Sequence, residues 1–110
     1  MNGLNSIILE GNVIDTNVSK MPNGTSVAEM TIAVKRTYKN ANGEFAEEVS
    51  FFEIKAYGNV ADICEKYATK DRGIRIVGRL KQERYEADGK LHSKVVVLAE
   101  HVEFKPEIKA

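Results

Sequence analysis

The stretch FFEIKAYGNVADICEKYAT, residues 51–69, decides the fold because the spacing of its apolar residues changes within it. Phe52, Ile54 and Ala56 alternate with residues of other kinds, which is the period-two pattern of a half-buried strand. Further on, the apolar residues fall at i, i+3, i+4 and i+7, the stripe of a short amphipathic helix: Val60, Ile63, Cys64 and Tyr67. We therefore expect a strand at residues 46–57 that leads into a helix at residues 59–69, with Asn59 as its N-cap.

Four stretches on either side of this one have the composition of strands. They are rich in β-branched residues or alternate in polarity, and we expect strands at residues 6–14, 26–39, 72–85 and 92–104. Residues 15–25, which contain the turn-forming segment MPNG, are expected to be a loop or the end of a hairpin. Three strands, a helix and a terminal hairpin follow the element order of the OB barrel. The sequence thus predicts an all-β fold with one short helix: a five-stranded OB-fold barrel with the helix between strands 3 and 4.

The composition is that of one soluble globular domain. The chain has 110 residues, of which 43% are hydrophobic and 29% charged. We expect an OB-fold domain at residues 1–105 and the start of a C-terminal tail, without an acidic tip, at residues 106–110. The formal net charge is zero. A polyanionic partner must therefore be attracted by a local patch of Lys and Arg rather than by the molecule as a whole.

Several classes of function lack the residues that they require. Cys64 is the only cysteine, which excludes an intramolecular disulfide and a cysteine-rich zinc site. His92 and His101 have no clustered partners at metal-ligand spacing, and no catalytic triad, paired carboxylates or phosphate-binding glycine loop is present. We expect no metal, no cofactor and no enzymatic activity. Because the sequence shows neither a signal-peptide pattern nor a membrane-length apolar run, we expect a soluble, cytoplasmic protein.

Aromatic and basic residues share the predicted outer face of the sheet. In the strand at residues 46–57, this face carries two rings beside two ionisable groups: Phe51, Glu53, Lys55 and Tyr57. In the strand at residues 72–85 it is mostly basic and ends in a ring: Arg75, Val77, Arg79, Lys81, Glu83 and Tyr85. The strand at residues 26–39 ends in KRTYK, which contains Lys35 and Tyr38. Unpaired bases stack on rings while cations follow the phosphates, so the pattern indicates binding of single-stranded DNA with weak sequence preference.

A second interpretation applies to each ring taken alone. Exposed Phe and Tyr residues on a sheet also pack in subunit interfaces or simply cover the sheet. Two other rings, Tyr67 and Phe104, are assigned to the core because of the helical spacing of the first and the strand-end position of the second.

The sequence resembles the bacterial single-stranded DNA-binding protein (SSB) family over residues 5–102. The resembling stretches are NSIILEGNV at residues 5–13, MPNG at 21–24, VA at 27–28, TIA at 31–33, YG at 57–58 and IVGRL at 76–80. The family commonly has tryptophan at several stacking positions, whereas this chain has none. Asp71-Arg72-Gly73 stands where the family usually has Lys-Gly, and the 110 residues given do not include the linker and acidic tip that the family generally has.

The resemblance implies a role for particular residues and for the assembly. Carried over one position at a time, base stacking falls to four rings: Tyr38, Phe51, Tyr57 and Tyr85. Phosphate contacts fall to five cations by face or position: Lys35, Lys55, Lys70, Arg79 and Lys81. The resemblance further implies a homotetramer that is associated with the nucleoid and protects unpaired strands in DNA replication, recombination and repair. Replication and repair proteins are expected as partners only if a full-length form carries the acidic tail.

Two functions of other classes compete with DNA binding. An interaction module, like the primosomal accessory proteins that share this fold, would use the aromatic face to bind another protein. A nucleic-acid enzyme is the weaker alternative, since OB domains occur in ligases and tRNA synthetases but this chain shows no nucleophile, metal cluster or nucleotide loop.

Overall fold

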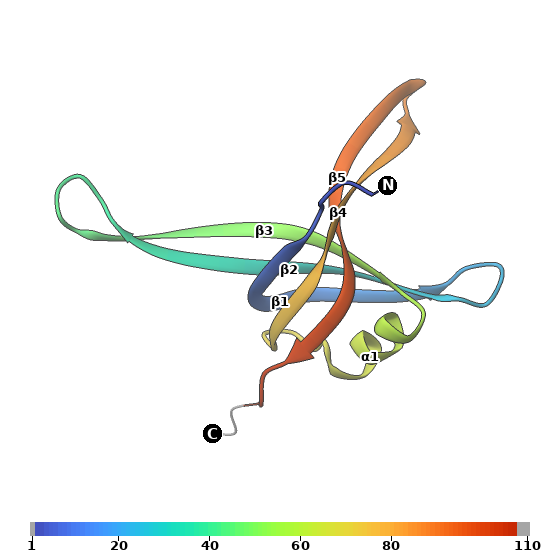
Figure 1. Cartoon of the computed structure of the whole chain (residues 1–110), viewed down its shortest axis with the longest axis horizontal. Helices are drawn as coiled ribbons and strands as arrows, with labels where there is room; N and C mark the ends of the chain where they lie inside the picture. Colours follow the sequence, from blue (N-terminus) through green and yellow to red (C-terminus); the bar gives the residue numbers. More distant parts are fainter. Residues whose placement is uncertain (1, 108–110) are drawn as a thin grey trace.

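The computed structural model, which describes residues 2–107, is a closed five-stranded barrel (Figure 1). Its elements follow one another as β1 (Ile7–Lys20), β2 (Ser26–Lys39), β3 (Phe45–Tyr57), α1 (Asn59–Tyr67), β4 (Gly73–Ala87) and β5 (Lys90–Phe104). Around the barrel the strands are ordered β1-β2-β3-β5-β4. The predicted fold class, five strands with a helix between the third and the fourth, is confirmed.

The barrel core is built from the alternating residues that the sequence pattern assigns to it. Met30 and Ile32 of β2, Ile54 of β3, and Ile74 and Ile76 of β4 are at most 1% exposed. Leu80, which shares the face of Ile74 and Ile76 by strand alternation, is 44% exposed. It lies opposite Val97 in the β4–β5 ladder, beyond the fully buried part of β4.

Residues 15–25, expected to be a loop or the end of a hairpin, form the end of the β1–β2 hairpin, and only the alternative of a loop is wrong over the first six residues. β1 continues to Lys20, because the backbone of Asp15–Lys20 pairs with that of Ser26–Thr31 in an antiparallel ladder. The side chains along this stretch alternate only weakly in polarity, so local composition did not reveal the strand. β1 pairs with β4 up to Asn12 and with β2 from Asn12 onward, and its ladder with β2 contains a register shift between Val13 and Asp15.

Helix α1 is shorter than expected and is capped differently. Gly58, with φ of 61°, holds the N-cap position instead of Asn59, and no side chain in the described part of the chain caps it. The helix packs on the barrel through small residues, Ala61 and Cys64, which are at most 1% exposed. This rotates Tyr67 outward to 48% exposure, and its ring lies 5.9 Å from the ring of Phe104. The assignment of Tyr67 to the core is therefore wrong.

Cys64 is a free cysteine inside this helix–barrel contact. Burial raises the pKa of its thiol to about 11. The residue behaves as a small apolar group of the core.

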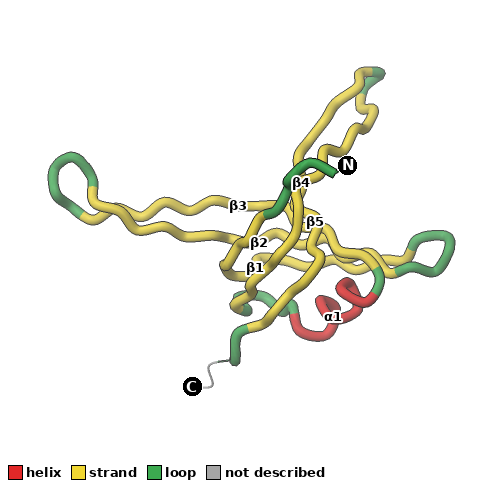
Figure 2. Tube along the Cα trace, viewed as in Figure 1, coloured by secondary structure: helices red, strands yellow, loops and turns green. Residues whose placement is uncertain are grey.

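Among the hairpins that project from the barrel, two are called arms (Figures 1 and 2). One is the far part of the β2–β3 hairpin, and the other is the far part of the β4–β5 hairpin. The β4–β5 arm ends in a two-residue turn, Asp88-Gly89, with φ of 54° and 74°, the combination that a tight antiparallel hairpin requires. The expected turn at residues 86–90 is thus reduced to two residues. Of the expected tail at residues 106–110, residues 108–110 lie outside the described part.

A substitution at Gly78 tests how closely the backbones of β4 and β5 approach each other. A Cβ atom at this position would lie 2.1 Å from the backbone oxygen of Leu98, so one strand must move. We expect Gly78→Ala to lower the free energy of unfolding by about 1–3 kcal/mol, measured by urea denaturation. Gly3→Ala is the control, because a Cβ there meets nothing within 4 Å. Equal stability of the two variants would contradict the close approach.

Candidate nucleic-acid interface

The outer face of β3 carries exposed rings, as the strand alternation requires. Phe51 is 64% exposed and Tyr57 is half-buried, whereas Ile54 and Ala56 between them are fully buried. β3 can place bulky rings on this side because its other face alone supplies apolar contacts to the core.

The β4–β5 arm adds Tyr85, together with two residues that the sequence analysis missed. Tyr85 is 46% exposed. It is paired across the hairpin with His92; their rings are stacked, with centroids 5.4 Å apart and an interplanar angle of 21°. The Lys94 ammonium lies 6.0 Å from the Tyr85 ring centroid. Counting residues outward from the Asp88-Gly89 turn along both strands places His92 opposite Tyr85. The position of this turn in the sequence could therefore have revealed His92 and Lys94 as neighbours of the ring.

An open groove lies between β3 and the base of this arm. Its volume is about 560 Å³, and it is lined by Lys55 of β3, residues 81–85 of β4 and Lys94 of β5. The structure therefore brings together three predicted site residues, Lys55, Lys81 and Tyr85, that the sequence separates by up to 30 positions.

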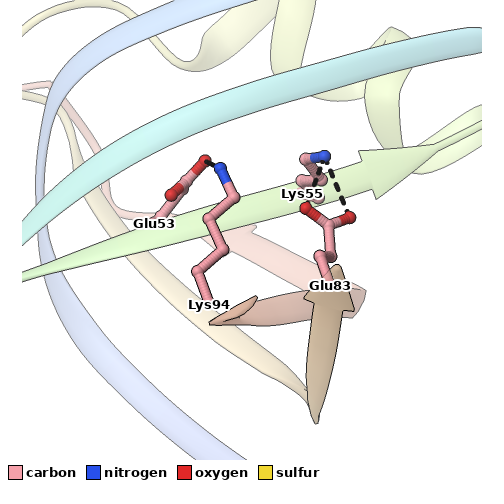
Figure 3. Close-up of polar contacts among 4 residues, drawn as sticks. All are labelled: Glu53, Lys55, Glu83 and Lys94. Atoms are coloured by element: carbon pink, nitrogen blue, oxygen red, sulfur yellow. Dashed lines mark hydrogen bonds and ion pairs between the residues drawn. The ribbon is translucent and has the colours of Figure 1, made fainter. Parts of the chain in front are cut away.

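Two ion pairs link β3 to the β4–β5 hairpin beside this groove (Figure 3). The Lys55 ammonium donates to both carboxylate oxygens of Glu83 at 2.8 and 2.9 Å, and the Lys94 ammonium donates to Glu53 at 2.9 Å. The first pair is largely shielded from water, with side chains 18% and 17% exposed. The hydrogen bonds raise the pKa of Lys55 and lower the pKa of Glu83 relative to their ordinary values, which outweighs the opposing effect of burial. The charge of Lys55 is thus already compensated.

The remaining predicted cations differ in their position. Arg79 lies in one row with Leu98 and Lys55 across the β4–β5–β3 pairing, so it shares the outer face. Arg79, Lys81 and Lys35 are exposed and form no ion pair within residues 2–107. Lys70 instead precedes β4, in a separate hollow of about 500 Å³ with Arg72 and Lys105, at the opposite end of that strand from Tyr85. The structure does not bring Lys70 to the groove.

Tyr38 lies on the other side of the β2–β3 ladder. The register is unbroken from Val27↔Tyr57 to Lys39↔Phe45, which places Tyr38 with Ala46, on the face opposite to Phe51. Tyr38 is 36% exposed, and the Arg36 guanidinium lies 4.9 Å from its ring centroid. The ring is accessible beside a cation, but at a different surface of the arm.

Acidic residues border the rings on the side away from the groove. A hollow of about 350 Å³ over β1, β2 and β3 is lined by Asp15, Glu29 and Glu53 together with Phe51. A polyanion that contacts Phe51 is therefore favoured on the side of the β4–β5 arm and disfavoured toward β1.

The shielded ion pair predicts a pH-dependent contribution to stability. Because the pKa of Glu83 is lower in the folded state, the pair stabilises the fold above the ordinary range of a carboxyl group, and this contribution is lost as the pH falls through the folded pKa. In a double-mutant cycle of Lys55→Met and Glu83→Gln, we expect a coupling energy of about 1 kcal/mol at pH 7 and a smaller one at pH 3. Urea denaturation of the four proteins measures it. Equal coupling at both pH values would contradict the assignment.

Comparison with known proteins agrees with the fold and with the resemblance seen in the sequence. A family model described as "Single-strand binding protein family" matches residues 4–105. The single-stranded DNA-binding protein of Aquifex aeolicus is 43% identical over 100 residues, which are 90% of this chain and 68% of that protein. The protein of the same name from Wolinella succinogenes is 34% identical over 101 residues, 90% of this chain and 62% of that one.

Solved structures share the architecture at lower identity. The structure titled "Plasmodium falciparum SSB complex with ssDNA" superimposes with a TM-score of 0.85 at 20% identity, covering 96% of this chain and 98% of that one. Wild-type single-stranded DNA binding protein from Thermus aquaticus gives 0.81 at 23% identity, covering 96% of this chain and 52% of that one. These two likenesses concern the fold. Since the family match extends over residues 4–105 and curated relatives are up to 43% identical, this chain belongs to the single-strand binding protein family.

Proposed function

We propose that this chain binds single-stranded DNA with little sequence preference and without changing it chemically. The observation that carries the proposal is the pair of exposed rings, Phe51 at 64% on the outer face of β3 and Tyr85 at 46% in a groove that contains cations. Such rings accept the face of any unpaired base, whereas paired bases in a duplex offer no free face. The names of the Aquifex and Wolinella relatives, which refer to single-stranded DNA, support the same function.

In the proposed arrangement, the DNA strand runs from the β4–β5 arm to the β2–β3 arm. Bases stack on Tyr85 of the β4–β5 arm, on Tyr57 and Phe51 of β3, and on Tyr38 where the strand passes around the β2–β3 arm. The acidic hollow over β1 and β2 keeps the phosphates away from that side. Each stacked ring contributes about 1–3 kcal/mol, so stacking provides the main part of the affinity of a chain whose net charge is zero.

Phosphates are proposed to follow the exposed cations of this path. Lys81, Arg79 and Lys35 are exposed, form no ion pair in the described chain and are the strongest candidates. Lys55 stays in the proposed site, but with its ammonium held by Glu83. Lys70 is kept as a remote contact for a longer strand that wraps the subunit. Lys94, beside Tyr85, joins the site.

Assembly and cellular role follow from the family and are part of the proposal. Residues 7–11 of β1 pair with β4 on one side, while the pairing of β1 with β2 begins at Asn12, so the first part of β1 has an open edge. Ile8 on this edge is 68% exposed, which suits strand pairing between subunits in the expected homotetramer. The proposed place of action is the cytoplasm, with the nucleoid, in replication, recombination and repair. No helix among the described residues is long and apolar enough to span a membrane.

Ring substitutions test the stacking mechanism. We expect labelled oligothymidine to bind the unmodified chain, and Phe51→Ala or Tyr85→Ala to weaken binding by about 1–3 kcal/mol each, measured by fluorescence anisotropy at fixed salt. Tyr67→Ala is the matched control, because this ring is similarly exposed at 48% but lies on α1. Equal affinity for duplex and single strand, or equal losses in all three variants, would be incompatible with stacking.

The salt dependence of DNA binding distinguishes lysines that form no ion pair in the described chain from lysines that form one. Each phosphate neutralised on a single strand contributes about −0.7 to the slope of log K against log salt. Because Lys81 is free and Lys55 is paired, we expect Lys81→Met to make the slope less steep by about 0.7 and Lys55→Met to leave it nearly unchanged. Titrations at four salt concentrations measure both slopes. A larger change for Lys55→Met would show that DNA displaces Glu83.

A further inference from the structure

Phe45, near the tip of the β2–β3 arm, is an exposed ring with no role in the arrangement above. It is 79% exposed, more than Phe51 or Tyr85. The Lys39 ammonium lies 5.6 Å from its ring centroid. A phenyl ring that is left in water gains little from burial, so packing in the barrel core does not account for it.

The strand register places Phe45 on the same face as Phe51. Residues 45, 49 and 51 have the same parity in β3, and the β2–β3 ladder contains no register shift between them. Val49 between the two rings is 40% exposed. Opposite this row, β2 presents Lys35 against Val49 and Lys39 against Phe45. The aromatic and basic pattern of the barrel thus continues outward along one face of the arm.

The tip of the arm holds Phe45 in a defined position. The Asn40 side-chain oxygen accepts hydrogen bonds from the backbone N–H groups of Asn42 and Glu44, both at 3.0 Å. Asn40 N–H also donates to the backbone oxygen of Glu44 at 2.8 Å. Since Glu44 directly precedes Phe45, the turn fixes the start of β3, and the ring is presented on ordered backbone.

We propose that Phe45 is a further base-stacking site, which extends the single-stranded DNA path along the Phe51 face of the β2–β3 arm, with Lys39 contacting the adjacent phosphate. This inference rests on the proposed function and deepens it. Six residues of strand separate Phe45 from Phe51, a distance of roughly 20 Å. The phosphates of a strand stacked as in a duplex are about 3.4 Å apart, so this distance corresponds to at most about six further nucleotides, and to fewer where the DNA strand is extended between rings.

The absence of tryptophan from the chain makes a direct test possible. In Phe45→Trp, the introduced ring is the sole tryptophan, and we expect its fluorescence to be quenched by oligothymidine only when the oligonucleotide is several nucleotides, up to about six, longer than the shortest one that binds. Ala41→Trp is the control, because Ala41 is exposed in the tip turn and does not belong to the row of rings. Quenching at Phe45→Trp but not at Ala41→Trp supports the proposal, and no quenching at either position would overturn it.

Affinity provides the second measurement. We expect Phe45→Leu, which keeps an apolar side chain but removes the ring, to weaken binding of long oligothymidine about fivefold or more and to leave binding of the shortest oligonucleotide unchanged. If Phe45→Leu or Phe45→Ala instead changes the subunit number in light scattering while long oligonucleotides bind normally, the ring belongs to a subunit contact and the proposal fails. Failure of the unmodified chain to bind any oligonucleotide would reject the proposed function itself.

Discussion

Closure of the barrel between β3 and β5 is the constraint on which the rest of the molecule depends. The backbone pairing at this seam is short and parallel, with Ile54 opposite Val97 and Lys55 opposite Leu98. Side chains add to the closure, because Lys55–Glu83 and Glu53–Lys94 tie β3 to the base of the β4–β5 arm (Figure 3). The same seam therefore closes the core and sets the direction in which the arm leaves the barrel. The position of Tyr85 relative to Phe51 follows from that direction.

The charge distribution on the outer face of the sheet also depends on the closure between β3 and β5. Some lysines of this face form ion pairs that stabilise the protein, and others form none among the described residues. Lys55 and Lys94 are opposed by carboxylates within hydrogen-bond distance, whereas Lys81 is exposed without such a partner in the described part of the chain. A net charge of zero is consistent with a proposed mode of binding in which rings provide most of the affinity and a few cations guide the backbone.

The sequence predicts what depends on neighbours along the chain and misses what depends on neighbours across the sheet. The alternation in β3 correctly separates Phe51 and Tyr57 from Ile54, and the change of period at residue 59 correctly places α1. The second half of β1 was missed because its strand character comes from pairing with β2. The incorrect prediction that Tyr67 is buried has a similar origin. Helical spacing defines an apolar face of the helix, but the packing of the small side chains of Ala61 and Cys64 on the barrel decides which part of that face is buried. The pairing of Glu83 with Lys55 requires the barrel to be closed and has no local signal.

The burial of Cys64 has a practical consequence for studying the two arms. Its side chain is 1% exposed and its thiol has a pKa of about 11, so almost no thiolate is present at neutral pH and alkylating dyes react slowly with it. A cysteine placed on an exposed turn such as Asn42 would then be the one rapidly reactive thiol among the described residues. Fluorophores could be attached there without removing the native residue, and the motion of an arm could be followed in single molecules of otherwise unaltered protein.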